Sequence, residues 1–141
     1  MLRKINVLLV DDSRTVLDQI EHILGEVDDL SIVGTARDAA GAIRMATESK
    51  PDLVLMDIVM PGLDGLSALR TIKSMYPRME VAMMSSLSGD AQKSEEAFRL
   101  GACQVLSKPF DSEIIESLVE NIRERLTNRA MPEDDSAEEA D

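Results

Sequence analysis

The sequence has only one cysteine, Cys103, and one histidine, His22. A single cysteine forms no internal disulfide, which agrees with a reducing compartment, and Cys103 is expected to be a small core residue. His22 is expected on a helix surface, so no histidine-based catalytic triad is available. No apolar run reaches the about 18 residues of a membrane-spanning helix, and MLRK leads directly into a strand pattern without a signal peptide. These absences predict a cytoplasmic protein without membrane insertion.

Basic residues are also few. The chain has 15 lysines and arginines against 27 aspartates and glutamates, a formal net charge of -12. Because nonspecific nucleic-acid affinity rests on many basic contacts to phosphates, this chain is not expected to bind nucleic acid. The C-terminal segment AMPEDDSAEEAD is rich in acidic side chains and has no basic one. We predict one folded domain over residues 1–127 and an acidic, disordered tail or linker stub over 128–141.

Short apolar runs recur along the chain and alternate with stretches of helical periodicity. The runs are INVLLV (5–10), SIVGTA (31–36), LVLM (53–56), VAMM (81–84) and CQVL (103–106), and the last helix is expected at about 112–126. Expected helix N-caps are Ser13, Asp38, Asp64, Asp90 and Asp111. Continuous apolarity is typical of strands covered on both faces. The pattern therefore predicts an α/β fold, a doubly wound five-stranded parallel sheet with helices on both faces.

Polar residues with a common chemistry follow several of these strands. Asp11 and Asp12 follow the first strand, Asp57 the third, Ser85 the fourth and Lys108 the fifth. In a doubly wound sheet the ligand site lies beyond the carboxyl ends of the strands, so these side chains are expected to meet there. Converging carboxylates need a compensating charge, and Mg²⁺ suits carboxylate oxygens. One carboxylate beside the metal can then attack phosphorus, and Asp57, which stands alone on its strand, is the preferred nucleophile.

Four segments carry a family resemblance: VDDS, LMDIVMPGLDG, MMSS and GACQVLSKPF, in this order. Together they resemble the receiver domain of bacterial two-component response regulators, including stand-alone chemotaxis regulators, over residues of about 5 to 127. The resemblance implies a flavodoxin-like fold with strand order 2-1-3-4-5, for which the chemotaxis regulator is itself a standard example.

The resemblance also implies roles. Asp57 would accept a phosphoryl group from the phosphohistidine of a histidine kinase. Asp12 would bind Mg²⁺ directly and Asp11 partly through water, while Asp57 itself and the backbone carbonyl of Val59 would complete the protein ligands of the metal.

Two further groups take their roles from the same resemblance. Ser85 would follow the phosphoryl group as the switch hydroxyl, and Lys108 would pair with that group. The bond from Lys108 to Pro109 would be cis, a state largely confined to proline. The phosphorylated domain would bind an output protein through the face formed by the fourth helix, fifth strand and fifth helix.

Three positions depart from the family pattern. Val105 stands where an aromatic residue often reports phosphorylation, so any switch is expected to work through backbone and helix shifts. Val59 and Leu87 stand where side chains flank the path of the hydrolytic water in this family. Because apolar side chains do not orient water, a slowly self-hydrolysing phosphoaspartate is expected.

Two segments indicate which members of the family this chain resembles most, but they leave several functions possible. MDIVMPGLDGL and MMSSLSGDAQKSEEAFRLGA look more like the receiver of chemotaxis methylesterases than like the small motor-binding regulator. The chain is then a stand-alone regulator or the regulatory domain of a larger methylesterase or transcription regulator. A phosphate-independent scaffold is a further alternative.

Two enzyme or ligand-binding classes fit the residues less well. A haloacid-dehalogenase-type phosphatase needs an acid two residues after its aspartate, where this chain has Val59. A nucleotide-binding protein is disfavoured because neither G-x-x-x-x-G-K-[ST] nor G-x-G-x-x-G follows the first strand. The chain is therefore not expected to be an enzyme beyond its own phosphorylation and dephosphorylation.

Overall fold

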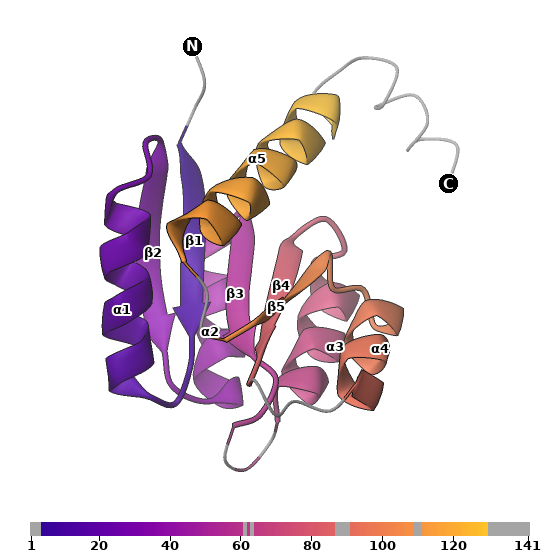
Figure 1. The fold of residues 1–141 in the computed structure, drawn as a ribbon. Coiled ribbons are helices and arrows are strands. Elements are labelled where there is room, and N and C mark those ends of the chain that lie inside the picture. The colour runs from indigo at the N-terminus through magenta and orange to yellow at the C-terminus, as the bar shows by residue number, and fades with distance from the viewer. Residues whose placement is uncertain (1–3, 61, 63, 87–90, 109–110, 130–141) are drawn as a thin grey trace.

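The computed structural model describes residues 4–60, 62, 64–86, 91–108 and 111–129. Strands and helices alternate along the chain, as the apolar runs predict (Figure 1). Their bounds are β1 (Ile5–Val10), α1 (Arg14–Gly25), β2 (Leu30–Ala36), α2 (Ala39–Ser49), β3 (Leu53–Asp57), α3 (Gly65–Met75), β4 (Glu80–Ser85), α4 (Ala91–Arg99), β5 (Gln104–Ser107) and α5 (Ser112–Arg129).

All neighbouring strands pair in parallel, in the order β2-β1-β3-β4-β5. Parallel strands need a crossover between them, and a helix provides each one. The strand order that the family resemblance implies is confirmed. Because the order reverses at β1, the loops that follow β1 and β3 leave the same edge of the sheet side by side.

Helices cover both faces of the sheet (Figure 1). One apolar cluster joins the sheet to α2, α3 and α4, with members such as Leu8, Val54 and Ile72. A second cluster joins the opposite face to α1 and α5, with members such as Leu9, Leu55 and Ile122. Consecutive residues of β1 and β3 thus enter different clusters, which explains why these strands are continuously apolar.

Acidic or hydroxyl side chains cap four of the helices at the expected positions. Ser13, Asp38, Asp64 and Asp111 each accept a hydrogen bond from a backbone N–H three residues later. These caps satisfy amide donors that have no partner within the helix. The expected cap Asp90 lies outside the described residues.

Some element ends differ from the sequence-based expectation by a few residues. β3 continues to Asp57, β4 begins already at Glu80, and α5 continues to Arg129, past the expected end of the domain at residue 127. The segment from residue 130 onward lies outside the described residues. Within the part of the chain that the structure describes, no helix combines the length and apolarity needed to cross a membrane.

Candidate functional site

Three carboxylates meet at the carboxyl edge of the sheet. Asp11 and Asp12 follow β1, and Asp57 ends the neighbouring β3; one oxygen from each side chain lies within 4.8 Å of the other two. Asp11 is fully buried, and Asp57 is 8% exposed. The expected convergence of these residues is therefore present in the structure. Such a cluster concentrates negative charge where little water screens it.

Lys108 compensates part of this charge. Its Nζ donates to Asp11 Oδ2 at 2.7 Å and to Asp57 Oδ2 at 3.0 Å. From the sequence, Lys108 is expected to pair with a phosphoryl group; in the structure its ammonium bridges two carboxylates. Lys108 reaches this position because its backbone N–H donates to the carbonyl of Ser85, which joins the ends of β4 and β5.

Backbone donors orient the same carboxylates. The amide of Ser13 donates to Asp11 Oδ1 at 2.9 Å, and the amide of Val59 donates to Asp57 Oδ1 at 3.2 Å. Each aspartate thus has one oxygen on a backbone amide and the other on Lys108. The side chains are held in one orientation before any ligand binds, which lowers the conformational cost of binding.

Burial and neighbouring charges shift two of the ionisable groups. Burial raises the pKa of Asp57, and the charge of Asp11 adds to this effect, while Lys108 opposes it. Burial alone would lower the pKa of Lys108, but its hydrogen bonds to Asp11 and Asp57 raise it above the ordinary value overall. Lys108 therefore stays a cation at neutral pH, next to a carboxylate whose ionisation the protein disfavours.

Three of the remaining candidate residues, Ser85, Val59 and Val105, lie in described parts of the chain. Ser85 ends β4, pairs with Ser107 and lies at the same sheet edge as Asp57. Val59 is 59% exposed beside the site, and Val105 in β5 is partly buried and packs against the α2–α3–α4 cluster. Leu87 and the bond from Lys108 to Pro109 fall outside the described residues.

Arg37 contacts the main chain beside this site and was not anticipated from the sequence. In the turn between β2 and α2, its guanidinium donates to the backbone carbonyl of Asp12, from Nη2 at 3.0 Å and from Nε at 3.4 Å. The sequence shows a basic residue directly before the helix cap Asp38, and this residue follows β2, the strand that pairs with β1. Neither periodicity nor a motif singles out such a residue.

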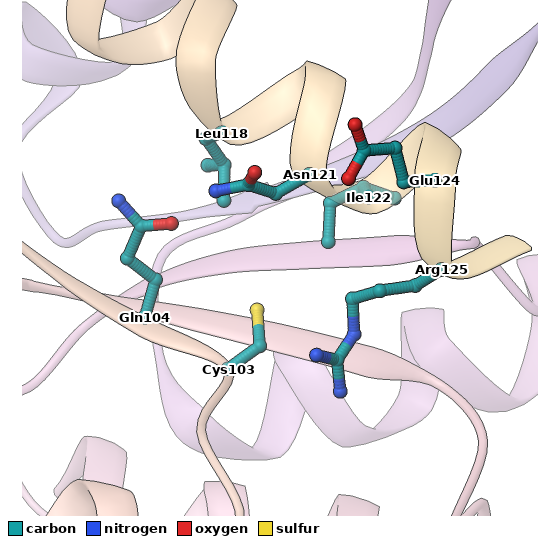
Figure 2. Close-up of a pocket in the computed structure, with 7 residues that line it drawn as sticks. All are labelled: Cys103, Gln104, Leu118, Asn121, Ile122, Glu124 and Arg125. Carbon is teal, nitrogen blue, oxygen red and sulfur yellow. The ribbon is translucent and has the colours of Figure 1, made fainter.

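A separate pocket of about 200 Å³ lies at the opposite end of the sheet, between the start of β5 and α5 (Figure 2). Its lining includes Cys103 and Arg125. Arg125 Nε donates at 2.9 Å to a carboxylate oxygen of Glu80, which is buried. Burial and the charge of Glu80 raise the pKa of Cys103 to about 11, so its thiol stays protonated at neutral pH. Cys103 is partly rather than fully buried.

His22 and Cys103 therefore contribute no catalytic chemistry to the carboxylate site. The His22 side chain is 81% exposed on α1, as expected for a surface residue.

Comparisons with known proteins agree with this geometry. The family described as "Response regulator receiver domain" matches residues 7–120. A protein-glutamate methylesterase/protein-glutamine glutaminase of Caldanaerobacter subterraneus is 42% identical over 110 residues, which cover 77% of this chain and 30% of that protein. The corresponding protein of Thermotoga maritima is 37% identical over 131 residues, covering 88% of this chain and 38% of that protein.

Solved structures show the same fold. The response regulator domain of Thermotoga maritima CheB has a TM-score of 0.77 and 36% identity, covering 89% of this chain and 98% of that chain. The CheX-CheY-BeF3-Mg+2 complex of Borrelia burgdorferi has a TM-score of 0.78 and 29% identity, covering 85% of this chain and 90% of that chain.

The five-stranded fold and the carboxylate–lysine edge thus define a class of signalling domains. The chain belongs to the response regulator receiver domain family. Its likeness to the receivers of chemotaxis methylesterases, expected from two sequence segments, is confirmed. The chain spans about a third of the length of the curated relatives that it matches.

Proposed function

We propose that Asp57 accepts a phosphoryl group from the phosphohistidine of a histidine kinase, in the presence of Mg²⁺, and that this modification regulates a partner or effector. One observation carries the proposal above all: Lys108 bridges Asp11 and Asp57 within a cluster of three converging carboxylates. A buried structural ion pair needs only one carboxylate for each cation, whereas this cluster has an excess of negative charge.

The donor set fits magnesium. Carboxylate oxygens with few protein ligands are the usual environment of Mg²⁺, and the oxygens of Asp11, Asp12 and Asp57 lie close enough to share one ion. Asp12 and Asp57 would bind it directly, with the backbone carbonyl of Val59, and Asp11 partly through water. Bound there, the ion would supply positive charge to the phosphoryl oxygens. The similar Borrelia complex combines CheX and CheY with BeF3 and Mg²⁺, which supports this assignment.

The chain's own residues divide the chemistry among them. An Asp57 carboxylate oxygen attacks phosphorus, a P–O bond forms, the P–N bond to the donor imidazole breaks, and the imidazole retains the electron pair and takes up a proton. Lys108 exchanges a carboxylate contact for a phosphoryl oxygen, and the Ser85 hydroxyl donates to another. Catalysis here is positioning and charge neutralisation, so no general base is required.

Phosphorylation changes the charge at one buried point and thereby biases the surrounding loops. The added phosphoryl oxygens gain contacts to Lys108 and Ser85 only in one arrangement of those loops, which shifts a pre-existing equilibrium. Val105 has no aromatic ring to rotate, so the change is transmitted through the backbone of β4, β5 and α4. The output surface is then the face of α4, β5 and α5.

The methylesterase relatives favour one form of this function. In these relatives, the region that is similar to this chain occupies about a third of a longer protein. In that form the domain is the cytoplasmic regulatory part of a methylesterase-type effector; in the other it is a stand-alone chemotaxis regulator. A phosphatase of the haloacid dehalogenase type has no support, because Val59 carries no proton to donate to a leaving group.

Asp57→Asn tests the phosphoacceptor. Incubated with a small phosphodonor and Mg²⁺, the wild-type chain is expected to gain one phosphoryl group in intact-mass analysis, and Asp57→Asn none, because an amide is not a nucleophile toward phosphorus. Asp18→Asn makes the same change at an exposed position on α1 and should be labelled like the wild type. Unmodified wild type, or equal labelling of Asp57→Asn, contradicts the proposal.

The lifetime of the phosphorylated chain gives a second prediction. The double variant Val59→Asn, Leu87→Glu supplies polar groups along the water path, so its lifetime should fall about tenfold through better orientation of the attacking water. Met75→Asn replaces another exposed apolar residue, on α3, and should leave the lifetime unchanged. The decay of the phosphorylated mass with time measures both. An unshortened lifetime in the double variant would argue against slow hydrolysis through apolar flanks.

A further inference from the structure

Arg37 makes a contact that crosses from one strand end to another. It lies in the exposed turn that joins β2 to α2, and it reaches the backbone carbonyl of Asp12. Nη2 at 3.0 Å and Nε at 3.4 Å converge on the same oxygen, so one edge of the planar guanidinium holds a single acceptor. Lysine has no such fork, because its ammonium is a point donor on a flexible stem.

The contact acts on the least restrained of the three carboxylate residues. Asp11 is held by Lys108 and by the Ser13 amide, and Asp57 by Lys108 and the Val59 amide. Asp12 lies in the bend between β1 and α1, and no ion pair to its carboxylate is found among the residues that the structure describes. Arg37 therefore restrains the main chain of Asp12 while its carboxylate stays available to a ligand.

The choice of acceptor matters for metal binding. A guanidinium paired with the Asp12 carboxylate would compete with a cation for the same oxygens. A guanidinium on the carbonyl instead fixes the bend from which the carboxylate projects toward Asp11 and Asp57. A ligand group held in place before binding loses less conformational freedom when the ion arrives.

We propose that Arg37 is a positioning residue for Mg²⁺ binding, which holds the Asp12 backbone so that the Asp12 carboxylate remains directed at the metal position. This inference rests on the proposed function. It assigns to a residue of the β2–α2 turn a share of the metal affinity of the site, although that residue offers the ion no ligand atom of its own.

The variant Arg37→Lys distinguishes the effect of the paired N–H donors of the guanidinium from the effect of its positive charge. It keeps a cation in the turn, so the repulsion between that cation and Mg²⁺ is retained, and it removes the paired donors. We expect the dissociation constant for Mg²⁺, measured on the full chain by titration calorimetry, to rise about fivefold, as for the loss of one ordinary hydrogen bond whose strength the surrounding water reduces. Arg44→Lys, on the exposed side of α2, is the matched control and should bind Mg²⁺ like the wild type.

Phosphorylation kinetics give a readout that a purely structural role would not produce. In Arg37→Lys the Mg²⁺ concentration for half-maximal labelling by a small phosphodonor should rise by the same factor, while the rate at saturating Mg²⁺ stays that of the wild type. The melting temperature without Mg²⁺ should stay within about 2 °C of the wild type, because the contact is exposed.

The outcomes are distinguishable. Equal Mg²⁺ affinity in Arg37→Lys and Arg44→Lys, or a lower labelling rate of Arg37→Lys at saturating Mg²⁺, overturns the role of Arg37 and leaves the proposed function intact. A wild-type chain that neither binds Mg²⁺ nor is labelled overturns the proposed function itself. The positioning role is supported if Arg37→Lys binds Mg²⁺ more weakly while Arg44→Lys does not, and if excess Mg²⁺ restores the labelling rate of Arg37→Lys to that of the wild type.

Discussion

Gly65→Ala is expected to lower the free energy of unfolding by about 3 kcal/mol or more, which is large for a single added methyl group. A Cβ at this position would clash with the carbonyl oxygen of Asp57 and would lie 2.9 Å from that of Ile58. Both obstacles are backbone atoms of the segment that ends β3, so no side chain can rotate to make room. The amide of Gly65 also donates to the carbonyl of Ile58 at 2.8 Å, which fixes the close approach.

The same substitution should disturb the site, because relieving the clash moves the backbone of Asp57. Urea unfolding would measure the stability and titration calorimetry the Mg²⁺ affinity, and both should fall. Gly25→Ala is the matched control: no atom lies within 4 Å of a Cβ built at Gly25, the last residue of α1. Its stability should be unchanged or slightly raised. Equal effects of the two substitutions would mean that the contact at Asp57 is not limiting.

Lys108→Met should have the second large effect. Methionine keeps much of the length and apolar volume of lysine but leaves Asp11 and Asp57 without their shared cation. Removing one partner of a buried ion pair commonly costs about 3 kcal/mol, since the remaining charge stays desolvated. Urea unfolding near neutral pH without Mg²⁺ measures the loss. Lys93→Met, on α4, removes a cation that makes no ion pair with the described residues and should have little effect.

The pH dependence of this loss follows from the direction of the pKa shifts. Burial already raises the pKa of Asp57, so folding disfavours its ionised form, and this cost is present at neutral pH and disappears as acid protonates the group. Lys108 has a raised pKa, so its stabilising effect is complete below its ordinary pKa and disappears only as pH rises through the raised value. The deficit of Lys108→Met should therefore shrink as acid protonates Asp57. A deficit that stays constant from neutral to acidic pH would contradict the charge explanation.

Much of the fold could be predicted because the same apolar residues carry both the pattern and the packing. In β1 the run from Val7 to Val10 is continuous, and alternate residues enter the two clusters on opposite faces of the sheet. The N-caps were predictable for a similar reason: a side chain such as Asp38 or Asp64 bonds to an amide three residues away, within reach of a local sequence motif.

Contacts between loops that are distant in the sequence were harder to predict. The convergence of Asp11, Asp12 and Asp57 followed from the topology rule, but the bridge from Lys108 to two carboxylates depends on a side-chain conformation that the sequence does not encode locally. Arg37 was missed because its acceptor is a backbone carbonyl, which has no residue type to recognise.

The buried Glu80 was likewise not anticipated. It begins β4 and is paired with Arg125, which lies 45 residues later on α5. An acidic residue at a strand start is normally expected to be solvent-exposed, and nothing near it in the sequence points to a partner that far along the chain.

The Lys108–Asp11 contact joins groups 97 residues apart in the sequence. It connects the ends of β1 and β5, and β3 and β4 lie between these two strands in the sheet. Closing a contact of such long range costs more chain entropy than closing a local one, and folds with many such contacts form slowly. During synthesis, a chain emerging from the ribosome would lack the site until the final strand has docked. Competence to receive a signal is thereby coupled to completion of the sheet, and incompletely folded molecules would be silent in the pathway.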